Sequence, residues 1–210
     1  MKKLIQGIID FRKHRIVDYR EKFSKLALGQ SPDTLFIACS DSRVVPNLFA
    51  STDPGDLFVI RNVGNLIPPC NLDGQSKGDK SEWAAIEFSI LHLNVSDIIV
   101  CGHSECGAIQ AIIQGRQNIT GDHLKSWLEY GEKAASVASK MEFSGKSLAE
   151  HNKISQANVL LQLAHLKTYS LIQERMKKGL LHLHGWWFDI GSGDVYSLDE
   201  TTRQFSLIGA

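Results

Sequence analysis

Residues 34–39 read TLFIAC, a short apolar run that Ser31-Pro32-Asp33 bounds on its amino side. A run that is apolar at nearly every position is typical of a strand buried on both faces, as in a parallel sheet. Three further candidate strands cover residues 56–60, 97–101 and 180–184. The sequence therefore predicts a central, mostly parallel sheet of four strands.

Helical patterns lie before and between these runs. Apolar residues recur at helical spacing from Leu4 to Phe23, and the pattern ends near Gly29. The segment 1–30 is therefore predicted as an N-terminal helical arm, either an ordinary surface helix or an arm that packs on a partner subunit. Ser81 is a candidate cap for a helix that continues to Leu91.

A longer helix is predicted near the C-terminus. Ser147-Leu-Ala-Glu150 is a capping-box pattern, and Lys177-Lys178 before Gly179 suits a helix end. After Trp187, the residues Gly191-Ser-Gly-Asp194 predict a hairpin turn that adds an antiparallel edge. Alternating strands and helices imply an α/β fold with helices around the sheet.

Length and composition limit the classes of function. A chain of 210 residues is long enough for one domain, predicted to span 1–210. Its 23 basic and 23 acidic residues cancel, which argues against a nucleic-acid or anionic-membrane partner. No apolar window has the length of a membrane span, and the apolar stretch from Leu4 to Ile9 is too short for a signal peptide. We therefore expect a cytoplasmic protein, whose four cysteines bind metal or are buried.

Candidate metal ligands stand where two predicted strands end. Cys39 ends the first run, and Cys101-Gly-His103 ends the third, so both belong to the edge of the sheet where sites gather. Cys106 follows His103 by three residues, a spacing that puts both side chains on one face at the start of a helix. Two thiolates and one imidazole suit a catalytic zinc ion with an open fourth position.

Two other interpretations of these residues remain open at this point. The first is that the cysteines are simply buried in the core without a metal, since buried cysteines are common and a His-x-x-Cys pair alone is a weak pattern. A non-catalytic zinc site would need a fourth protein ligand, for which Cys70 or Cys101 is available.

A carboxylate and a guanidinium follow the first candidate ligand, in the sequence Cys39-Ser-Asp41-Ser-Arg43. Asp41 and Arg43 could form a purely structural ion pair. Alternatively, Asp41 accepts a hydrogen bond from the reacting water, while Arg43 keeps Asp41 ionised and oriented.

Four motifs in this order resemble those of the β-class carbonic anhydrases: Gly29-Gln-Ser-Pro32, Ala38-Cys-Ser-Asp-Ser-Arg43, Arg61-Asn-Val-Gly-Asn65 and Gly102-His-Ser-Glu-Cys-Gly107. The resemblance covers almost the whole chain. It implies reversible hydration of carbon dioxide to bicarbonate, one Zn²⁺ per subunit, and assembly into a homodimer or homotetramer.

The resemblance also implies roles for individual residues. Cys39, His103 and Cys106 match the family's zinc ligands, and Asp41 and Arg43 match its Asp-Arg dyad. The positions that match substrate-contacting residues are Gln30, which reaches in from the neighbouring subunit, and Phe58, Phe88 and Gly107.

Two questions remain within the family. Some relatives hydrolyse carbonyl sulfide or carbon disulfide on the same fold and zinc site. Others have a closed site, in which the aspartate itself ligates zinc beside a bicarbonate pocket of tryptophan, arginine and tyrosine. Arg61 matches that arginine, but Phe36 replaces the tryptophan, and the tyrosine position falls near Trp187 or Phe188. The sequence therefore predicts an open site, with Asp41 off the metal and paired to Arg43.

Overall fold

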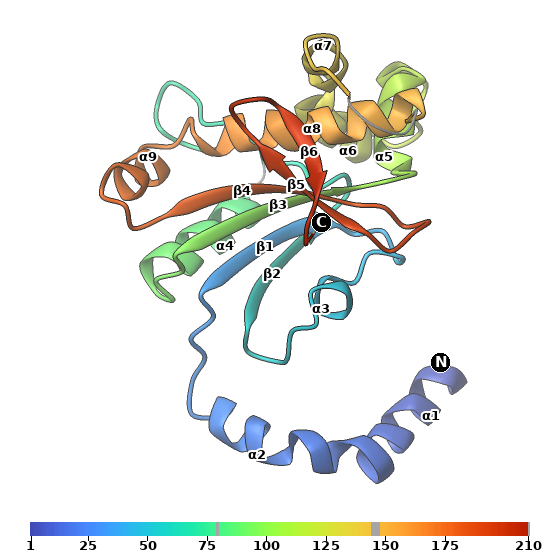
Figure 1. Cartoon of the computed structure of the whole chain (residues 1–210), viewed down its shortest axis with the longest axis vertical. Coiled ribbons are helices and arrows are strands. Elements are labelled where there is room, and N and C mark those ends of the chain that lie inside the picture. Colours follow the sequence, from blue (N-terminus) through green and yellow to red (C-terminus); the bar gives the residue numbers. More distant parts are fainter. Residues whose placement is uncertain (79, 144–147, 210) are drawn as a thin grey trace.

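The centre of the molecule is a six-stranded sheet with the order β2-β1-β3-β4-β5-β6 (Figure 1). The computed structural model describes residues 1–78, 80–143 and 148–209. The strands are β1 (Thr34–Cys39), β2 (Leu57–Asn62), β3 (Asp97–His103), β4 (His182–Phe188), β5 (Val195–Asp199) and β6 (Gln204–Leu207). Strands β1 to β4 run parallel to one another. Strand β5 is antiparallel to β4, and β6 is antiparallel to β5. The predicted fold class is confirmed.

Helices pack mainly along one face of this sheet, where α8 crosses β3 and β4 (Figure 1). The α-helices are α1 (Lys2–Asp10), α2 (Ile16–Leu26), α3 (Pro46–Phe49), α4 (Lys80–Leu91), α5 (Gly107–Ile113), α6 (Asp122–Trp127), α7 (Ala134–Ala138), α8 (Glu150–Leu166) and α9 (Ser170–Lys177). Three short helices of other types are η1 (Phe11–Arg15), η2 (Arg116–Asn118) and η3 (Leu128–Gly131). The helix predicted to follow Ser81 is present, but it begins at Lys80, so Ser81 lies inside its first turn and does not precede the helix as the predicted cap.

The strand β1 is buried on both faces, as its uninterrupted apolar run predicts. Leu35 and Ile37 belong to the core that includes Val159 of α8. Phe36 and Ala38 face the other way, and Phe36 packs on Phe49 of α3 with ring centroids 6.0 Å apart. This burial fixes the direction of β1 and thereby the place of Cys39 at its end.

The single long helix predicted to run to Lys177 is wrong, because the structure has two helices with a break at residues 167–169. Tertiary contacts cause the break. The Thr168 hydroxyl accepts a hydrogen bond from the Cys70 amide at 2.9 Å, and the Tyr169 hydroxyl donates to the Pro68 carbonyl at 2.7 Å. The Tyr169 ring also stacks on Trp83 at 3.5 Å, which outweighs local helix propensity. Ser147 of the predicted capping box lies outside the described residues.

The predicted hairpin after β4 is confirmed. Its turn is closed by the Asp189 amide, which donates to the Asp194 carbonyl at 2.9 Å, and by the Gly193 amide, which donates to the Asp189 carbonyl at 2.8 Å. Gly193 has a φ of 80°, a conformation that favours glycine. The further strand β6 was not predicted, because its four residues are too short to give a pattern.

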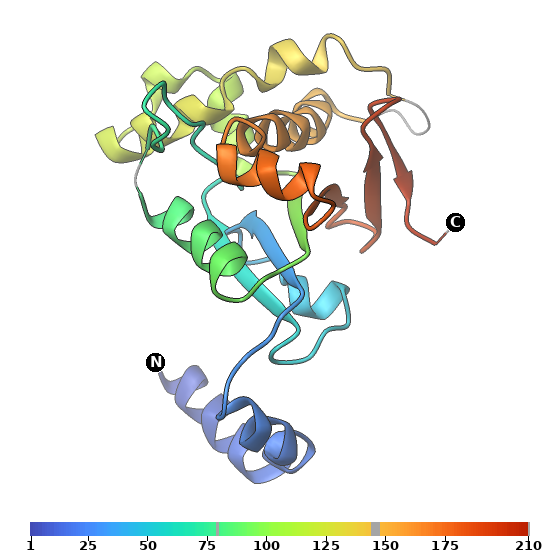
Figure 2. The same ribbon diagram turned by 90° about the vertical axis from the view of Figure 1, so that its left-hand side faces the viewer.

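The helices of the N-terminal arm (residues 1–30) lie away from the body of the chain (Figure 2). None of its described helices contains a buried residue, and Leu4 and Ile8 are 66% and 60% exposed. The Lys22–Asp53 ion pair connects α2 to the body. No helix in the described part of the chain combines the length and apolarity that a membrane crossing requires.

His165 on α8 gives the fold a testable pH dependence. Burial lowers the pKa of His165, whose Nδ1 lies 2.7 Å from the Ile67 carbonyl. As the pH falls below about 6.5, the unfolded state binds a proton at His165 that the folded state excludes, so this residue makes the free energy of unfolding decrease. In denaturant titrations at pH 7.5 and 5.5, we expect His165→Gln to lose less stability than the wild type. His123→Gln, at an exposed histidine, is the control; an unchanged pH dependence in His165→Gln would contradict the assignment.

Candidate metal centre

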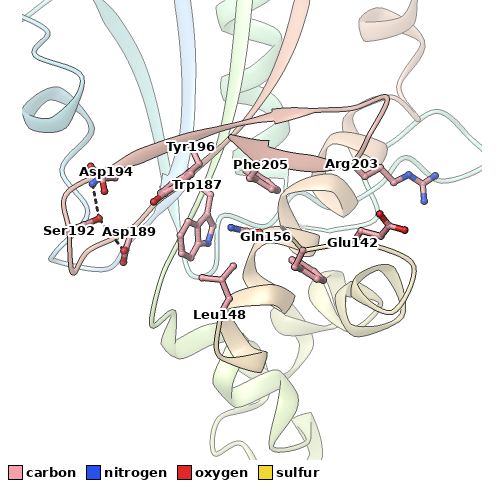
Figure 3. Close-up of a pocket in the computed structure, with 11 residues that line it drawn as sticks. Glu142, Leu148, Gln156, Trp187, Asp189, Ser192, Asp194, Tyr196, Arg203 and Phe205 are labelled. Atoms are coloured by element: carbon pink, nitrogen blue, oxygen red, sulfur yellow. Dashed lines mark hydrogen bonds between the residues drawn. The ribbon is translucent and has the colours of Figure 1, made fainter. Parts of the chain in front are cut away.

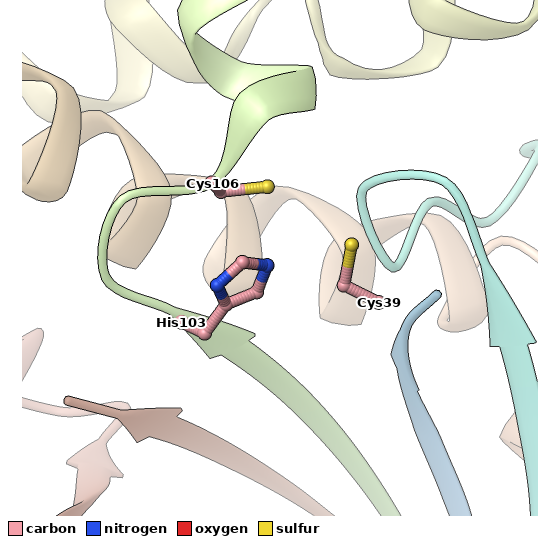
Figure 4. Close-up of side chains that lie close together, drawn as sticks. All are labelled: Cys39, His103 and Cys106. Atoms are coloured by element: carbon pink, nitrogen blue, oxygen red, sulfur yellow. The ribbon is translucent and has the colours of Figure 1, made fainter. Parts of the chain in front are cut away.

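Three side chains meet at the carboxyl edge of the parallel sheet (Figure 4). Cys39 is the last residue of β1, His103 is the last residue of β3, and Cys106 directly precedes α5. Their potential ligand atoms all lie within 4.8 Å of one another, and all three residues are buried. The structure therefore brings together the three residues that the sequence predicts as zinc ligands.

The imidazole of His103 has one nitrogen fixed and one free. Nδ1 lies 2.8 Å from the Ser104 carbonyl, which assigns the proton to Nδ1 and leaves Nε2 as an acceptor. Nε2 is buried and has no hydrogen-bond partner. A buried polar atom without a partner is costly, and a metal ion beside the two sulfurs would satisfy it. The donor set fits zinc on this ground.

The two thiols differ in how readily they ionise. The neighbouring Cys106 thiol, the His103 side chain and the Gly64 amide lower the pKa of Cys39 to about 4, against the effect of burial. The Gly64 amide donates to Cys39 Sγ at 3.3 Å. The pKa of Cys106 is raised, because its thiol is hydrogen-bonded to Cys39 and is buried. One thiolate thus forms readily here, and a bound cation would stabilise the second.

The other two cysteines stay apart from this group. Cys101 lies in the core with Phe36, and burial raises the pKa of its thiol. The Cys70 thiol donates to the Asn71 carbonyl at 3.3 Å. Among the residues that the structure describes, only Cys39, His103 and Cys106 form such a three-membered ligand group. A zinc ion held by these three residues would keep a fourth position for water or substrate.

Asp41 and Arg43 form the pair that the sequence predicts beside Cys39. Arg43 Nε and Nη2 donate to the two carboxylate oxygens of Asp41 at 2.9 and 2.7 Å. This bidentate contact holds the pKa of Asp41 well below its usual range. Arg43 Nη2 also donates to the Glu105 carbonyl at 3.0 Å, which connects the loops that carry Cys39 and Cys106.

The loop between His103 and Cys106 is held by α8. Glu105 has a φ of 55°, which is unusual for a residue other than glycine. The Asn152 side chain accepts from the Glu105 amide at 2.9 Å and donates to its carboxylate at 3.1 Å, and His151 Nε2 lies 2.8 Å from the same carboxylate. Ser155 donates to the His103 carbonyl at 2.7 Å.

Sequence reasoning missed these supporting residues on α8. A signal was present, because the helix carries buried polar side chains at helical spacing in an otherwise apolar segment: Asn152, Ser155, Gln156, Asn158 and Gln162. Buried polar groups require partners, so such a face indicates a site or loop to be held.

The predicted substrate-contacting residues divide into two groups. Gly107, the first residue of α5, follows Cys106 directly. Gln30 is exposed and precedes β1, whose length of roughly 16 Å separates it from Cys39. Phe58 pairs with Leu35, about 13 Å back along the strand from Cys39. Its ring lies 5.8 Å from that of Phe88, which is 42% exposed. The structure therefore does not bring Gln30, Phe58 and Phe88 to the metal centre of their own chain.

The residues at the closed-site bicarbonate positions have other contacts. Arg61 donates from Nε and Nη2 to the Cys39 carbonyl at 3.0 and 2.8 Å. Trp187 donates to the Ser155 hydroxyl at 3.2 Å, and Phe188 stacks on Phe49 at 4.5 Å. Trp187 lines a cavity of about 240 Å³ between the C-terminal hairpin and α8 (Figure 3), and none of the three candidate ligands lines that cavity.

Comparisons with known proteins agree on one family. A family model described as carbonic anhydrase matches residues 34–195. A carbonic anhydrase of Pseudomonas aeruginosa is 39% identical over 205 residues, which cover 98% of this chain and 90% of that protein. The structure of the β-carbonic anhydrase CcaA is similar with a TM-score of 0.88 and 36% identity, over 100% of this chain and 92% of that one. A tetrameric β-carbonic anhydrase from the ascomycete Sordaria macrospora has a TM-score of 0.77 and 27% identity, over 100% and 96% of the two chains.

Proposed function

This chain belongs to the β-class carbonic anhydrases, zinc enzymes that hydrate carbon dioxide reversibly, and we propose that Cys39, His103 and Cys106 hold its catalytic zinc ion. The observation that supports this assignment is the buried, unpartnered Nε2 of His103 beside two cysteine sulfurs. When bound, zinc supplies the acidity that turns water into a nucleophile near neutral pH. The protein has to hold that water, orient it and bring carbon dioxide to it.

Asp41 and Arg43 perform the orienting step in this proposal. Because Arg43 holds both carboxylate oxygens and depresses the pKa of Asp41, the carboxylate stays an acceptor across the working pH range. It accepts a hydrogen bond from the reacting water and directs a lone pair of that water toward the carbon of carbon dioxide. This role requires the open form of the site, with Asp41 paired to Arg43 and not bound to the metal.

In this proposal, the substrate pocket at the metal centre of a partner subunit is completed by Gln30, Phe58 and Phe88. Their distance from Cys39 of their own chain and the exposure of Gln30 and Phe88 support it. The unburied apolar side chains of the N-terminal arm support a dimer in which each arm packs on the other subunit. The two β-carbonic anhydrases solved from Sordaria macrospora are tetrameric, which supports a dimer or a pair of dimers here. Phe58 and Phe88 form the apolar wall, and the Gln30 amide and the Gly107 backbone N–H are donors to the substrate oxygens.

Subunit mixing tests this exchange of residues. Gln30→Ala and Cys39→Ser are each expected to have low activity as pure dimers. If Gln30 serves the partner's metal centre, every mixed dimer contains one intact site, so co-refolding equal amounts should restore roughly a quarter of the wild-type sites. Stopped-flow carbon dioxide hydration measures the recovery. If Gln30 instead serves the metal centre of its own chain, no mixed dimer has an intact site and activity stays low.

The substrate assignment is tested by parallel assays of carbon dioxide and carbonyl sulfide on zinc-loaded protein. Every relative described above is named as a carbonic anhydrase, so we expect carbon dioxide hydration to dominate. Hydrolysis of carbonyl sulfide without hydration of carbon dioxide, from mildly acidic to alkaline pH, would contradict this. The cytoplasmic location stays a prediction.

A further inference from the structure

The cavity between the C-terminal hairpin and α8 takes no part in the mechanism above (Figure 3). Neither the three candidate metal ligands nor Asp41 and Arg43 line it. Its volume is about 240 Å³, whereas one water molecule needs only about 10–15 Å³ of such space. The cavity therefore has room for a molecule with an aromatic ring.

Most of the cavity wall is apolar and aromatic. Trp187 of β4 is buried, and its ring centroid lies 5.8 Å from that of Tyr196 on β5. The half-buried side chains of Phe143, Leu148 and Phe205 complete this wall. Pockets with such a lining and a few converging polar groups are typical sites for small, flat ligands.

A buried amide side chain is also part of the wall. Gln156 of α8 is 5% exposed, and Figure 3 shows its side chain between those of Trp187 and Glu142. Within the described part of the chain, no residue forms a hydrogen bond with this amide. In contrast, Asn158 on the same helix donates to the Gly64 carbonyl at 3.2 Å. A buried amide without partners costs free energy, and a group in the cavity that both donates and accepts would satisfy it.

The charged residues of the wall are paired or reach solvent. Asp189 accepts a hydrogen bond from the Ser104 hydroxyl at 2.9 Å. Asp194 is half-buried, and Glu142 and Arg203 are exposed. A ligand that reaches Gln156 loses its hydration there, which is costly for an ion and far less costly for an uncharged group with hydrogen-bond partners. The wall therefore favours an uncharged aromatic ligand.

We propose that this cavity binds a small, uncharged aromatic molecule that carries a carboxamide or an equivalent pair of adjacent donor and acceptor groups. The ligand N–H donates to Gln156 Oε1, and Gln156 Nε2 donates to the ligand oxygen, as in a pair of amides. The aromatic ring packs among Trp187, Tyr196 and Phe205. This site is separate from the metal centre and does not depend on the function proposed there.

Benzamide is the probe that tests the proposal, and saturation-transfer NMR on the zinc-loaded enzyme measures its Kd. The wild type should bind benzamide with a Kd of about 1 mM or tighter, an affinity within reach of so small a ligand. Acetophenone has nearly the same shape but lacks the N–H donors, so it leaves Gln156 Oε1 unpaired. Its Kd should be about fivefold higher than that of benzamide.

Gln156→Met keeps the approximate size of the side chain and removes its hydrogen-bonding groups. This variant should raise the Kd of benzamide by about tenfold and that of acetophenone by less, so that the two probes bind alike. Gln173→Met, at an exposed glutamine of α9 that does not line the cavity, is the matched control. It should bind both probes as the wild type does, and thermal unfolding should show that both variants are folded.

A wild type without saturable binding at ten times the expected Kd of benzamide would overturn the proposal, since the cavity would then hold water only. Equal affinity of the wild type for benzamide and acetophenone would also overturn it, and this comparison needs no variant. An unchanged Kd of benzamide in Gln156→Met, or a raised one in Gln173→Met, would place the bound probe elsewhere on the protein.

Discussion

Cys39→Ser is expected to lose zinc and to lower kcat/KM for carbon dioxide hydration by about three orders of magnitude. Cys39 contributes the thiol that ionises most readily, since neighbouring groups lower its pKa to about 4. A serine hydroxyl in the same place is a far weaker ligand and leaves His103 Nε2 and Cys106 without a complete donor set. Metal analysis of the purified protein and stopped-flow hydration assays measure the two losses together.

Cys70→Ser is the matched control for this substitution. Cys70 is a half-buried thiol that donates a hydrogen bond to the Asn71 carbonyl, and it lies outside the metal-ligand group. This variant should keep one zinc ion per chain and the wild-type rate. Full activity in Cys39→Ser would refute the ligand assignment, whereas equal losses in both variants would point to a general effect of removing thiols.

Asp41→Asn is expected to keep its zinc and yet to lower kcat by about a hundredfold. The neutral amide removes the partner of Arg43 and presents a donor as well as an acceptor to the reacting water. The water is then held in more than one orientation, and the productive one is less populated. Because Asp41 lies outside the group of three ligand atoms, the metal content should not change.

Metal analysis distinguishes the two forms of the site. Loss of zinc in Asp41→Asn would mean that Asp41 is itself a ligand, and this would overturn the open form. Asp73→Asn, at an exposed loop aspartate, is the control and should match the wild type in both rate and zinc content. The hydration rate of Arg43→Lys should lie between the rates of Asp73→Asn and Asp41→Asn, because lysine keeps the charge and loses the bidentate contact.

Much of the sheet could be predicted because its strands are buried. The runs that form β1 and β3 are apolar along their length, and burial on both faces leaves few alternatives to a parallel sheet. The helix break at residues 167–169 could not be predicted in this way. It depends on the hydrogen bonds that join Thr168 and Tyr169 to Cys70 and Pro68, about 100 residues earlier, and the local sequence contains no sign of these bonds.

The same distinction between local and long-range information applies to the site. Cys39, Asp41 and Arg43 lie within five residues, and Cys106 lies three residues after His103, so short motifs reveal them. The supports on α8 do not share a motif with the ligands they hold. Asn152 meets Glu105 only because α8 crosses β3, a relation that the fold creates and that single-sequence patterns do not contain.

The arm that lies away from its own body has a consequence for how the enzyme's output scales. If the groups that contact substrate are delivered by the neighbouring chain, an isolated chain holds metal but lacks a complete catalytic pocket. Mass action then governs catalysis as well as stability, since dilution below the dimer dissociation constant removes active sites without unfolding a single subunit. Specific activity then depends on the protein concentration, and carbon dioxide turnover requires enough protein to exceed the dimer dissociation constant.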